Sequence, residues 1–106
     1  TITGIPGELY PEIAVGRIDS PKGADFAIEP QGVPPLRGQL PGKRNIMVNL
    51  ANDAIRYIIT KSEWDKDAPW IYDESEDTYG EVVSLGPNTA PVIHQTVIKL
   101  AEESKP

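Results

Sequence analysis

Cysteine is absent from this 106-residue sequence, so neither a disulfide framework nor a thiolate metal site is available. Positive charge is also scarce, because 10 lysines and arginines stand against 16 aspartates and glutamates, a net charge of −6. A nucleic-acid-binding surface needs clustered basic residues that displace counterions from phosphates, so we expect no nucleic-acid partner. The same deficit argues against docking to an anionic membrane by charge.

Long apolar runs are missing too, since no stretch approaches the roughly 20 residues of a membrane-spanning helix. We therefore expect no transmembrane segment, and no signal peptide is recognisable. The chain begins at Thr1 without a methionine, which we interpret as a processed or trimmed piece of a longer protein. Hydrophobic residues make up only 39% of the sequence, which is few for the core of one domain of this length.

Proline and glycine are abundant by contrast, with 11 and 9 copies. They concentrate in residues 17–44, which hold five prolines and four glycines. Loops longer than about 12–15 residues are uncommon inside compact domains. We interpret residues 17–44 as an excursion within a single unit that spans residues 1–106. The excursion is either a functional flap or a segment that lies across protein outside this chain.

The remaining segments alternate between strand and helix patterns. Residues 1–5, 46–51 and 57–60 are apolar and β-prone, and the nearly continuous run at 46–51 is typical of a buried strand. We further expect a short helix over 8–15, a helical turn capped by Ser62, an extended segment over 79–86, and a C-terminal helix capped by Asn88 or Thr89. This order favours an α/β fold, with α+β as the alternative, of two to four strands and a C-terminal helix. So few strands indicate a fragment of a larger layered domain.

The segment 64–79 combines six carboxylates with Trp64, Trp70 and Tyr72. Such a segment is usually a solvated loop whose rings fold back onto the body of the protein. The alternative is a cation-binding or ligand-binding face, and a ligand-binding face would present the three rings together on one exposed side. The carboxylates lack the glycine-centred spacing of an EF-hand calcium loop.

The sequence gives little support for any of the familiar sets of catalytic residues. The single histidine, His94, falls beside the apolar stripe of the C-terminal helix, where packing is a commoner role than metal ligation. One histidine far from any strained serine gives no Ser-His-Asp set, and no phosphate-binding glycine loop is present. A catalytic zinc site usually takes three protein ligands, commonly histidines with a carboxylate, and the chain cannot supply these alone. No catalytic residue is assigned.

The chain is organised around the bend at residues 5–8, Ile-Pro-Gly-Glu. Pro6 fixes its own φ, and Gly7 permits a sharp turn. Glu8 then follows a short strand, and sites of α/β proteins are commonly built at strand ends. A first-turn glutamate that complements a helix dipole is the simpler interpretation of the same residue.

Five short motifs occur in order: Ile-Pro-Gly-Glu at 5–8, Leu-Ala-Asn-Asp at 50–53, Tyr-Ile-Ile-Thr-Lys-Ser-Glu-Trp at 57–64, Tyr-Gly-Glu at 79–81 and Leu-Gly-Pro-Asn-Thr at 85–89. This succession resembles the C-terminal portion of the catalytic domain of the neutral/alkaline (non-lysosomal) ceramidases and their uncharacterised bacterial relatives. The resemblance covers nearly the whole chain apart from the excursion, which departs from the family and leaves the substrate open.

The resemblance implies a zinc-dependent amidohydrolase that cleaves a lipid amide with metal-activated water. Carried over by motif, Glu8 is the carboxylate ligand of the zinc ion and Tyr57 is the tyrosine ligand. The two histidine ligands of the family have no counterpart in this chain, and His94 matches neither of them. A secreted, periplasmic or cell-surface location is an expectation from the same resemblance.

A chain that holds half of a metal site is expected to be inactive alone and to bind zinc weakly or not at all. Its partners are expected to be the remainder of the parent domain or a second copy of itself. A non-catalytic self-associating module and a ligand-binding module based on residues 64–79 are the alternatives. The enzyme hypothesis places Glu8 beside Tyr57, whereas a self-associating module would leave them apart.

Overall fold

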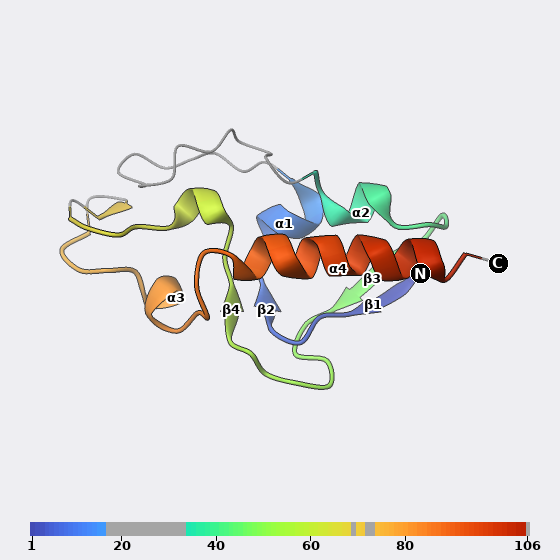
Figure 1. Ribbon diagram of the computed structural model, residues 1–106, viewed down its shortest axis with the longest axis horizontal. Helices are drawn as coiled ribbons and strands as arrows, with labels where there is room; N and C mark the ends of the chain where they lie inside the picture. The colour runs from blue at the N-terminus through green and yellow to red at the C-terminus, as the bar shows by residue number, and fades with distance from the viewer. Residues whose placement is uncertain (17–33, 69, 72–73, 106) are drawn as a thin grey trace.

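The computed structural model describes residues 1–16, 34–68, 70–71 and 74–105. Within these ranges the chain forms short strands and helices and one long C-terminal helix (Figure 1). In chain order the elements are β1 (Ile2–Gly4), β2 (Glu8–Leu9), α1 (Pro11–Val15), α2 (Leu36–Gln39), β3 (Ile46–Val48), β4 (Tyr57–Ile58), the 3-10 helix η1 (Lys61–Glu63), α3 (Tyr79–Val82) and α4 (Thr89–Glu103). The α/β character predicted from the sequence is confirmed.

The strands form two parallel pairs, each of which joins the first ten residues to the middle of the chain. β1 pairs with β3, with Thr3 opposite Met47, and β2 pairs with β4, with Glu8 opposite Tyr57. Parallel strands need a crossover connection, and α1 and α2 lie in the connection between β2 and β3. An isolated bridge from Tyr57 to Ser84 extends the second pair towards α3.

The two strand pairs are separated by unequal lengths of chain. Three residues connect β1 to β2, whereas eight (49–56) connect β3 to β4. The longer segment folds over the bend at Pro6 and Gly7. The carbonyl oxygens of these two residues accept hydrogen bonds from Ile55 N at 2.8 Å and Leu50 N at 3.1 Å. The bend is therefore fixed by the chain that packs against it as well as by its own residues.

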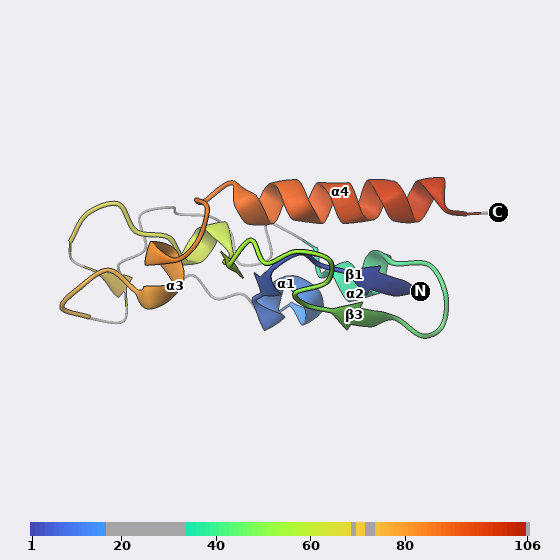
Figure 2. The same cartoon turned by 90° about the horizontal axis from the view of Figure 1, so that it is seen from below.

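α4 lies along one side of the molecule, over α1, α2 and the β1–β3 pair (Figures 1 and 2). Its apolar stripe is only partly covered, since Val97 and Ala101 are buried but Leu100 is 58% exposed. Pro91 falls in the first turn, as predicted, where a missing N–H costs little. The main core cluster consists of Ile5, Leu9, Ile13, Leu36, Leu40, Ile58, Ala90, Val97 and Ala101.

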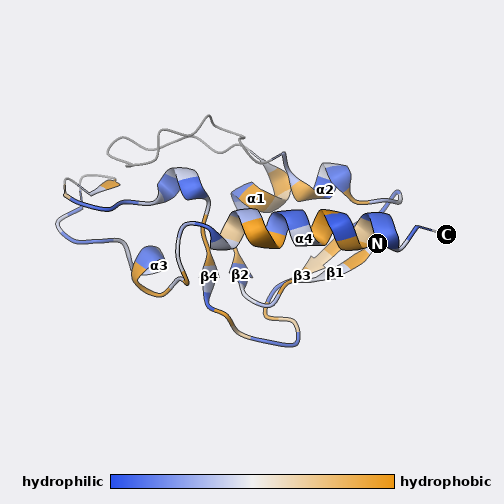
Figure 3. Cartoon of the chain, viewed as in Figure 1, coloured by the Kyte–Doolittle hydropathy of each residue, from blue (hydrophilic) through white to orange (hydrophobic). Residues whose placement is uncertain are grey.

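The β1–β3 pair is rich in apolar residues (Figure 3), and several of them are exposed. Ile2 is 77% exposed and Ile46 is 57% exposed. The predicted strand at 46–51 is therefore present as β3, but its predicted burial is wrong for this chain. The molecule is also elongated, with a radius of gyration of 14.3 Å. A compact domain of 100 residues has a radius of gyration of about 13 Å.

Three local predictions are wrong. The helix expected over 8–15 begins only at Pro11, because the first two of these residues pair with β4 as strand β2. The segment expected to be extended over 79–86 contains the helix α3. The turn expected to be capped by Ser62 is η1, which has Thr60 at its N-cap position.

The proline- and glycine-rich excursion over 17–44 is described only in part, because residues 17–33 lie outside the described ranges. The remainder contains α2, whose Leu36 is fully buried in the core cluster. This part of the excursion therefore belongs to the body of the protein. Among the described residues, no helix has the length and apolar character needed to cross a bilayer.

Candidate functional site

Glu8 and Tyr57 lie side by side in the second strand pair. Glu8 opens β2, Tyr57 opens β4, and the two residues are partners in the parallel register. A backbone hydrogen bond of 2.9 Å from Glu8 N to Arg56 O holds the two chains together at this point. The structure thus brings the predicted pair together, at the start of two short strands rather than at the strand end that the sequence suggested for Glu8.

The two side chains interact directly. The negative charge of Glu8 raises the pKa of Tyr57 above its usual value of 10.0, and desolvation, a hydrogen bond to Glu8 and the neighbouring Tyr79 act in the same direction. At neutral pH the phenol is therefore protonated and donates to the Glu8 carboxylate. The Glu8 carboxylate and the Tyr57 phenol are therefore neighbours in the second strand pair.

Replacement of Glu8 by glutamine is expected to lower the pKa of Tyr57, because the variant lacks the charge that opposes phenolate formation. In the wild type the folded state keeps the Tyr57 proton to a higher pH than the unfolded state. The stabilisation from this pair is therefore complete below about pH 10 and is lost as the pH rises further. An NMR titration of the Tyr57 ring measures the shift, with Glu102→Gln on the exposed side of α4 as control. An unchanged pKa in Glu8→Gln would refute the direct interaction.

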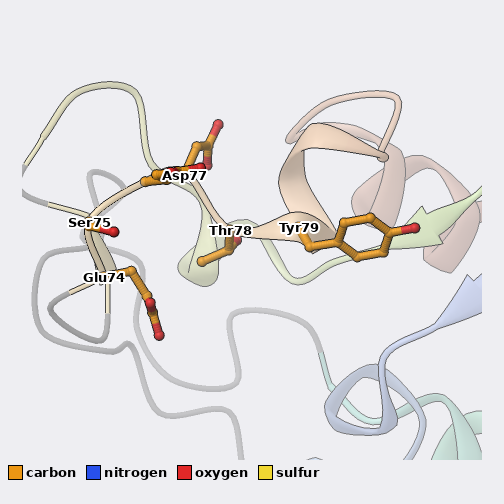
Figure 4. Close-up of a pocket in the computed structure, with 6 residues that line it drawn as sticks. Glu74, Ser75, Asp77, Thr78 and Tyr79 are labelled. Atoms are coloured by element: carbon orange, nitrogen blue, oxygen red, sulfur yellow. The ribbon is translucent and has the colours of Figure 1, made fainter.

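Two further tyrosines flank the phenol of Tyr57. Its ring makes edge-to-face contacts with Tyr10 at a centroid distance of 6.0 Å and with Tyr79 at 5.9 Å. Gly80 permits the approach of Tyr10 to α3, because a Cβ at this position would collide with the Tyr10 hydroxyl. The ring of Tyr79 is 72% exposed and extends from α3 towards β4 (Figure 4). Aromatic surface therefore borders the carboxylate–phenol pair on two sides.

His94 has a packing role in this structure. The residue is 6% exposed, and its Nε2 lies 2.6 Å from the carbonyl oxygen of Pro34 and 3.3 Å from Nε2 of Gln39. Because a carbonyl oxygen can only accept, the histidine carries its proton on Nε2 and donates it to Pro34. The ring therefore ties α4 to the segment that precedes α2, which favours packing over metal ligation.

A second polar site, which we call the acidic cluster, lies beside α3 and consists of Asp65, Asp77 and Glu81. One ligand oxygen from each residue lies within 4.8 Å of the other two. Asp65 and Glu81 are 8% and 4% exposed. Desolvation raises the pKa of Glu81 to about 8, with the neighbouring carboxyl group of Asp77 acting in the same direction and the N–H of Asp65 opposing it. The cluster therefore holds a buried carboxyl group that retains its proton at neutral pH.

The interpretation favoured from the sequence, a solvated acidic run over 65–78, did not identify this cluster, although a cation-binding face was the alternative for that run. No local signal identifies the contact of Asp77 with Glu81, because Asp77 precedes Thr78, the N-cap residue of α3, and the segment at 79–86 was expected to be extended.

A pocket of about 340 Å³ adjoins the acidic cluster and is lined by residues 74–79 (Figure 4). Asp77 belongs to both the pocket and the cluster, and its side chain extends to the opposite side of the segment from that of Glu74. The lining is dominated by carboxyl and hydroxyl groups, which is unsuitable chemistry for an acyl chain.

The ligand-binding face predicted as an alternative for residues 64–79 is not formed as expected. Trp64 is only 9% exposed, and Trp70 is partly buried. Tyr72 lies outside the described residues. A face that needs Trp64 as an exposed platform is therefore excluded.

Comparison of the chain with protein-family models, with curated proteins and with solved structures finds no match. The functional conclusion therefore depends on the placement of Glu8 and Tyr57 together with the ordered motifs of the sequence.

Proposed function

We propose that this chain is part of a zinc-dependent amidohydrolase of the ceramidase type, in which Glu8 and Tyr57 supply two of the protein ligands. The observation that supports this proposal is the in-register contact of the two side chains, which come from distant motifs. The resemblance to the ceramidases assigns a ligand role to these two residues, and that role requires them to be neighbours.

The in-register placement of Glu8 and Tyr57 suits a shared zinc ion. Two ligands at about 2.1 Å from a tetrahedral zinc ion lie about 3.4 Å apart. Both groups are hard oxygen donors once they are deprotonated.

The chain's own residues would bind and orient in this site. Zinc bound there would polarise an amide carbonyl and lower the pKa of water towards ~7. Glu8 interacts with the Tyr57 phenol, and the rings of Tyr10 and Tyr79 contact the ring of Tyr57 edge to face. The two histidine ligands must come from elsewhere in the parent protein, since His94 donates its Nε2 proton to Pro34.

The test measures zinc content and hydrolysis of a linear N-acyl lipid amide by the complete gene product that contains this chain. Glu8→Gln and Tyr57→Phe are each expected to lower activity at least about a hundredfold and to reduce bound zinc. Glu102→Gln removes the same charge from the exposed face of α4 and is expected to match the wild type. Wild-type zinc content in both site variants would refute the proposed ligand roles.

The chain alone is expected to bind zinc weakly. Complete structural zinc sites contribute about 10–16 kcal/mol, so half of a ligand set corresponds to about 5–8 kcal/mol and a Kd between about 1 μM and 0.2 mM. Calorimetric titration with zinc checks this value as part of the same test.

A self-associating module is the second candidate function. The exposed apolar side chains of β1 and β3, such as Ile2 and Ile46, favour a surface that another protein covers. In the enzyme proposal this cover is the remainder of the parent domain. Sedimentation velocity distinguishes the two, because a chain that stays monomeric at ~100 μM rules out stable self-association.

A further inference from the structure

We propose that the acidic cluster of Asp65, Asp77 and Glu81 binds a divalent cation of the calcium class, independently of the zinc site. The three carboxylates come from two segments that are distant in sequence, since Asp65 follows η1 whereas Asp77 and Glu81 flank the start of α3. Full ionisation of three carboxyl groups within 4.8 Å of one another is unfavourable, and a bound divalent cation would offset this cost.

Unsatisfied buried oxygens provide the independent support for a ligand. Asp65 N donates to Glu81 Oε1 at 2.8 Å, and Ile71 N donates to Asp65 Oδ2 at 2.8 Å. The remaining oxygens, Asp65 Oδ1 and Glu81 Oε2, are buried and have no hydrogen-bond partner among the described residues. Buried polar atoms in native proteins nearly always have a partner. One cation would satisfy both oxygens, while the backbone hydrogen bonds keep the two carboxylates oriented.

The ligand set favours calcium over magnesium, because magnesium usually keeps several waters and is held by one or two carboxylates, whereas calcium accepts more oxygen ligands in a flexible geometry. Calcium–oxygen distances of about 2.3–2.6 Å allow two ligands of one ion to lie up to about 5 Å apart. The bound of 4.8 Å on the oxygen separations in the cluster is compatible with calcium without movement of the side chains. Asp77 is exposed, so the remaining coordination positions are open to water.

Cation binding at this cluster would stabilise α3 against the segment that carries Asp65. Tyr79 lies in the same short helix and contacts the ring of Tyr57. The same ion would therefore fix one of the two aromatic walls beside Glu8. This structural role needs no catalytic activity and does not depend on the proposed function.

The experiment is a calcium titration of the EDTA-treated chain by calorimetry, followed by thermal unfolding at constant ionic strength. One calcium ion is expected to bind, and calcium at a hundredfold excess over Kd raises Tm by on the order of 10 °C. Magnesium is expected to raise Tm less. Glu81→Gln keeps an oxygen that accepts the Asp65 N–H but loses the ligand charge, so its calcium Kd rises at least about tenfold. Asp77→Asn, at an exposed position, is expected to weaken binding without disturbing the fold.

Glu74→Gln is the matched control, because it removes the same charge from the adjacent pocket through a side chain that extends away from Asp77 (Figure 4). It is expected to bind calcium as the wild type does. Absence of calcium binding in the wild type would overturn the proposal and leave a proton shared by Glu81 and Asp77 as the occupant. Equal loss of binding in Glu74→Gln and Glu81→Gln would also overturn it, because the effect would then be general charge screening.

Discussion

Alanine at position 7 is expected to destabilise the protein by about 3 kcal/mol or more, a large part of the 5–15 kcal/mol that holds a domain folded. A Cβ on Gly7 would lie 2.5 Å from the carbonyl oxygen of Arg56 and 3.0 Å from side-chain atoms of Ile55 and Ile58. The Arg56 carbonyl cannot swing aside, because it accepts the hydrogen bond from Glu8 N that aligns β2 with β4. Urea unfolding followed by circular dichroism measures the loss.

The control for this substitution is Gly38→Ala in α2, where a Cβ meets nothing within 4 Å. Alanine favours a helix over glycine, so this variant is expected to gain about 0.5–1 kcal/mol. Gly7→Ala is also expected to separate Glu8 from Tyr57 and thus to lower the raised pKa of that phenol. A Gly7→Ala protein with wild-type stability would show that the bend tolerates a side chain and that the described packing is wrong.

The sequence predicts the elements whose signals are local. The start of α4 follows from Pro91 in the first turn and from the apolar spacing after it, whereas Asn88 occupies the N-cap position without the predicted side-chain capping hydrogen bond. The strands at 57–60 and 1–5 follow from β-prone composition. The pairing of Glu8 with Tyr57 has no local signal, and only the resemblance to a family suggested it.

The errors occur where distant contacts decide the structure. β2 is only two residues long and exists because Glu8 N and Tyr10 N bond to carbonyl oxygens of the 56–58 segment. α3 is helical although it contains valine, because Glu81 accepts a hydrogen bond from Asp65 N and Gly80 packs closely against Tyr10. Tertiary contacts override local propensity at both places.

Exposure is the property that the apolar pattern predicts least well. The run at 46–51 indicates that β3 is suited to burial, but the pattern does not specify which protein covers it. In this chain Ile46 is 57% exposed, whereas Ile58 in β4 is fully buried. The same residue type therefore occupies two opposite environments, and a matched pair of substitutions can measure the difference.

Ile58→Ala is expected to lower the free energy of unfolding by about 3–4 kcal/mol, because it leaves a cavity beside Leu9 and Gly7 at the centre of the core. Ile46→Ala removes the same atoms from an exposed strand and is expected to cost less than about 0.5 kcal/mol in this chain. Urea unfolding of both variants measures the contrast, and similar losses would contradict the burial described for β3 and β4. In the proposed parent protein the contrast is expected to shrink, because a domain that covers β3 would make Ile46→Ala cost about 1–3 kcal/mol. An Ile46→Ala cost that stays near zero there would show that β3 remains exposed, and the covering role proposed for the remainder of the domain would fail.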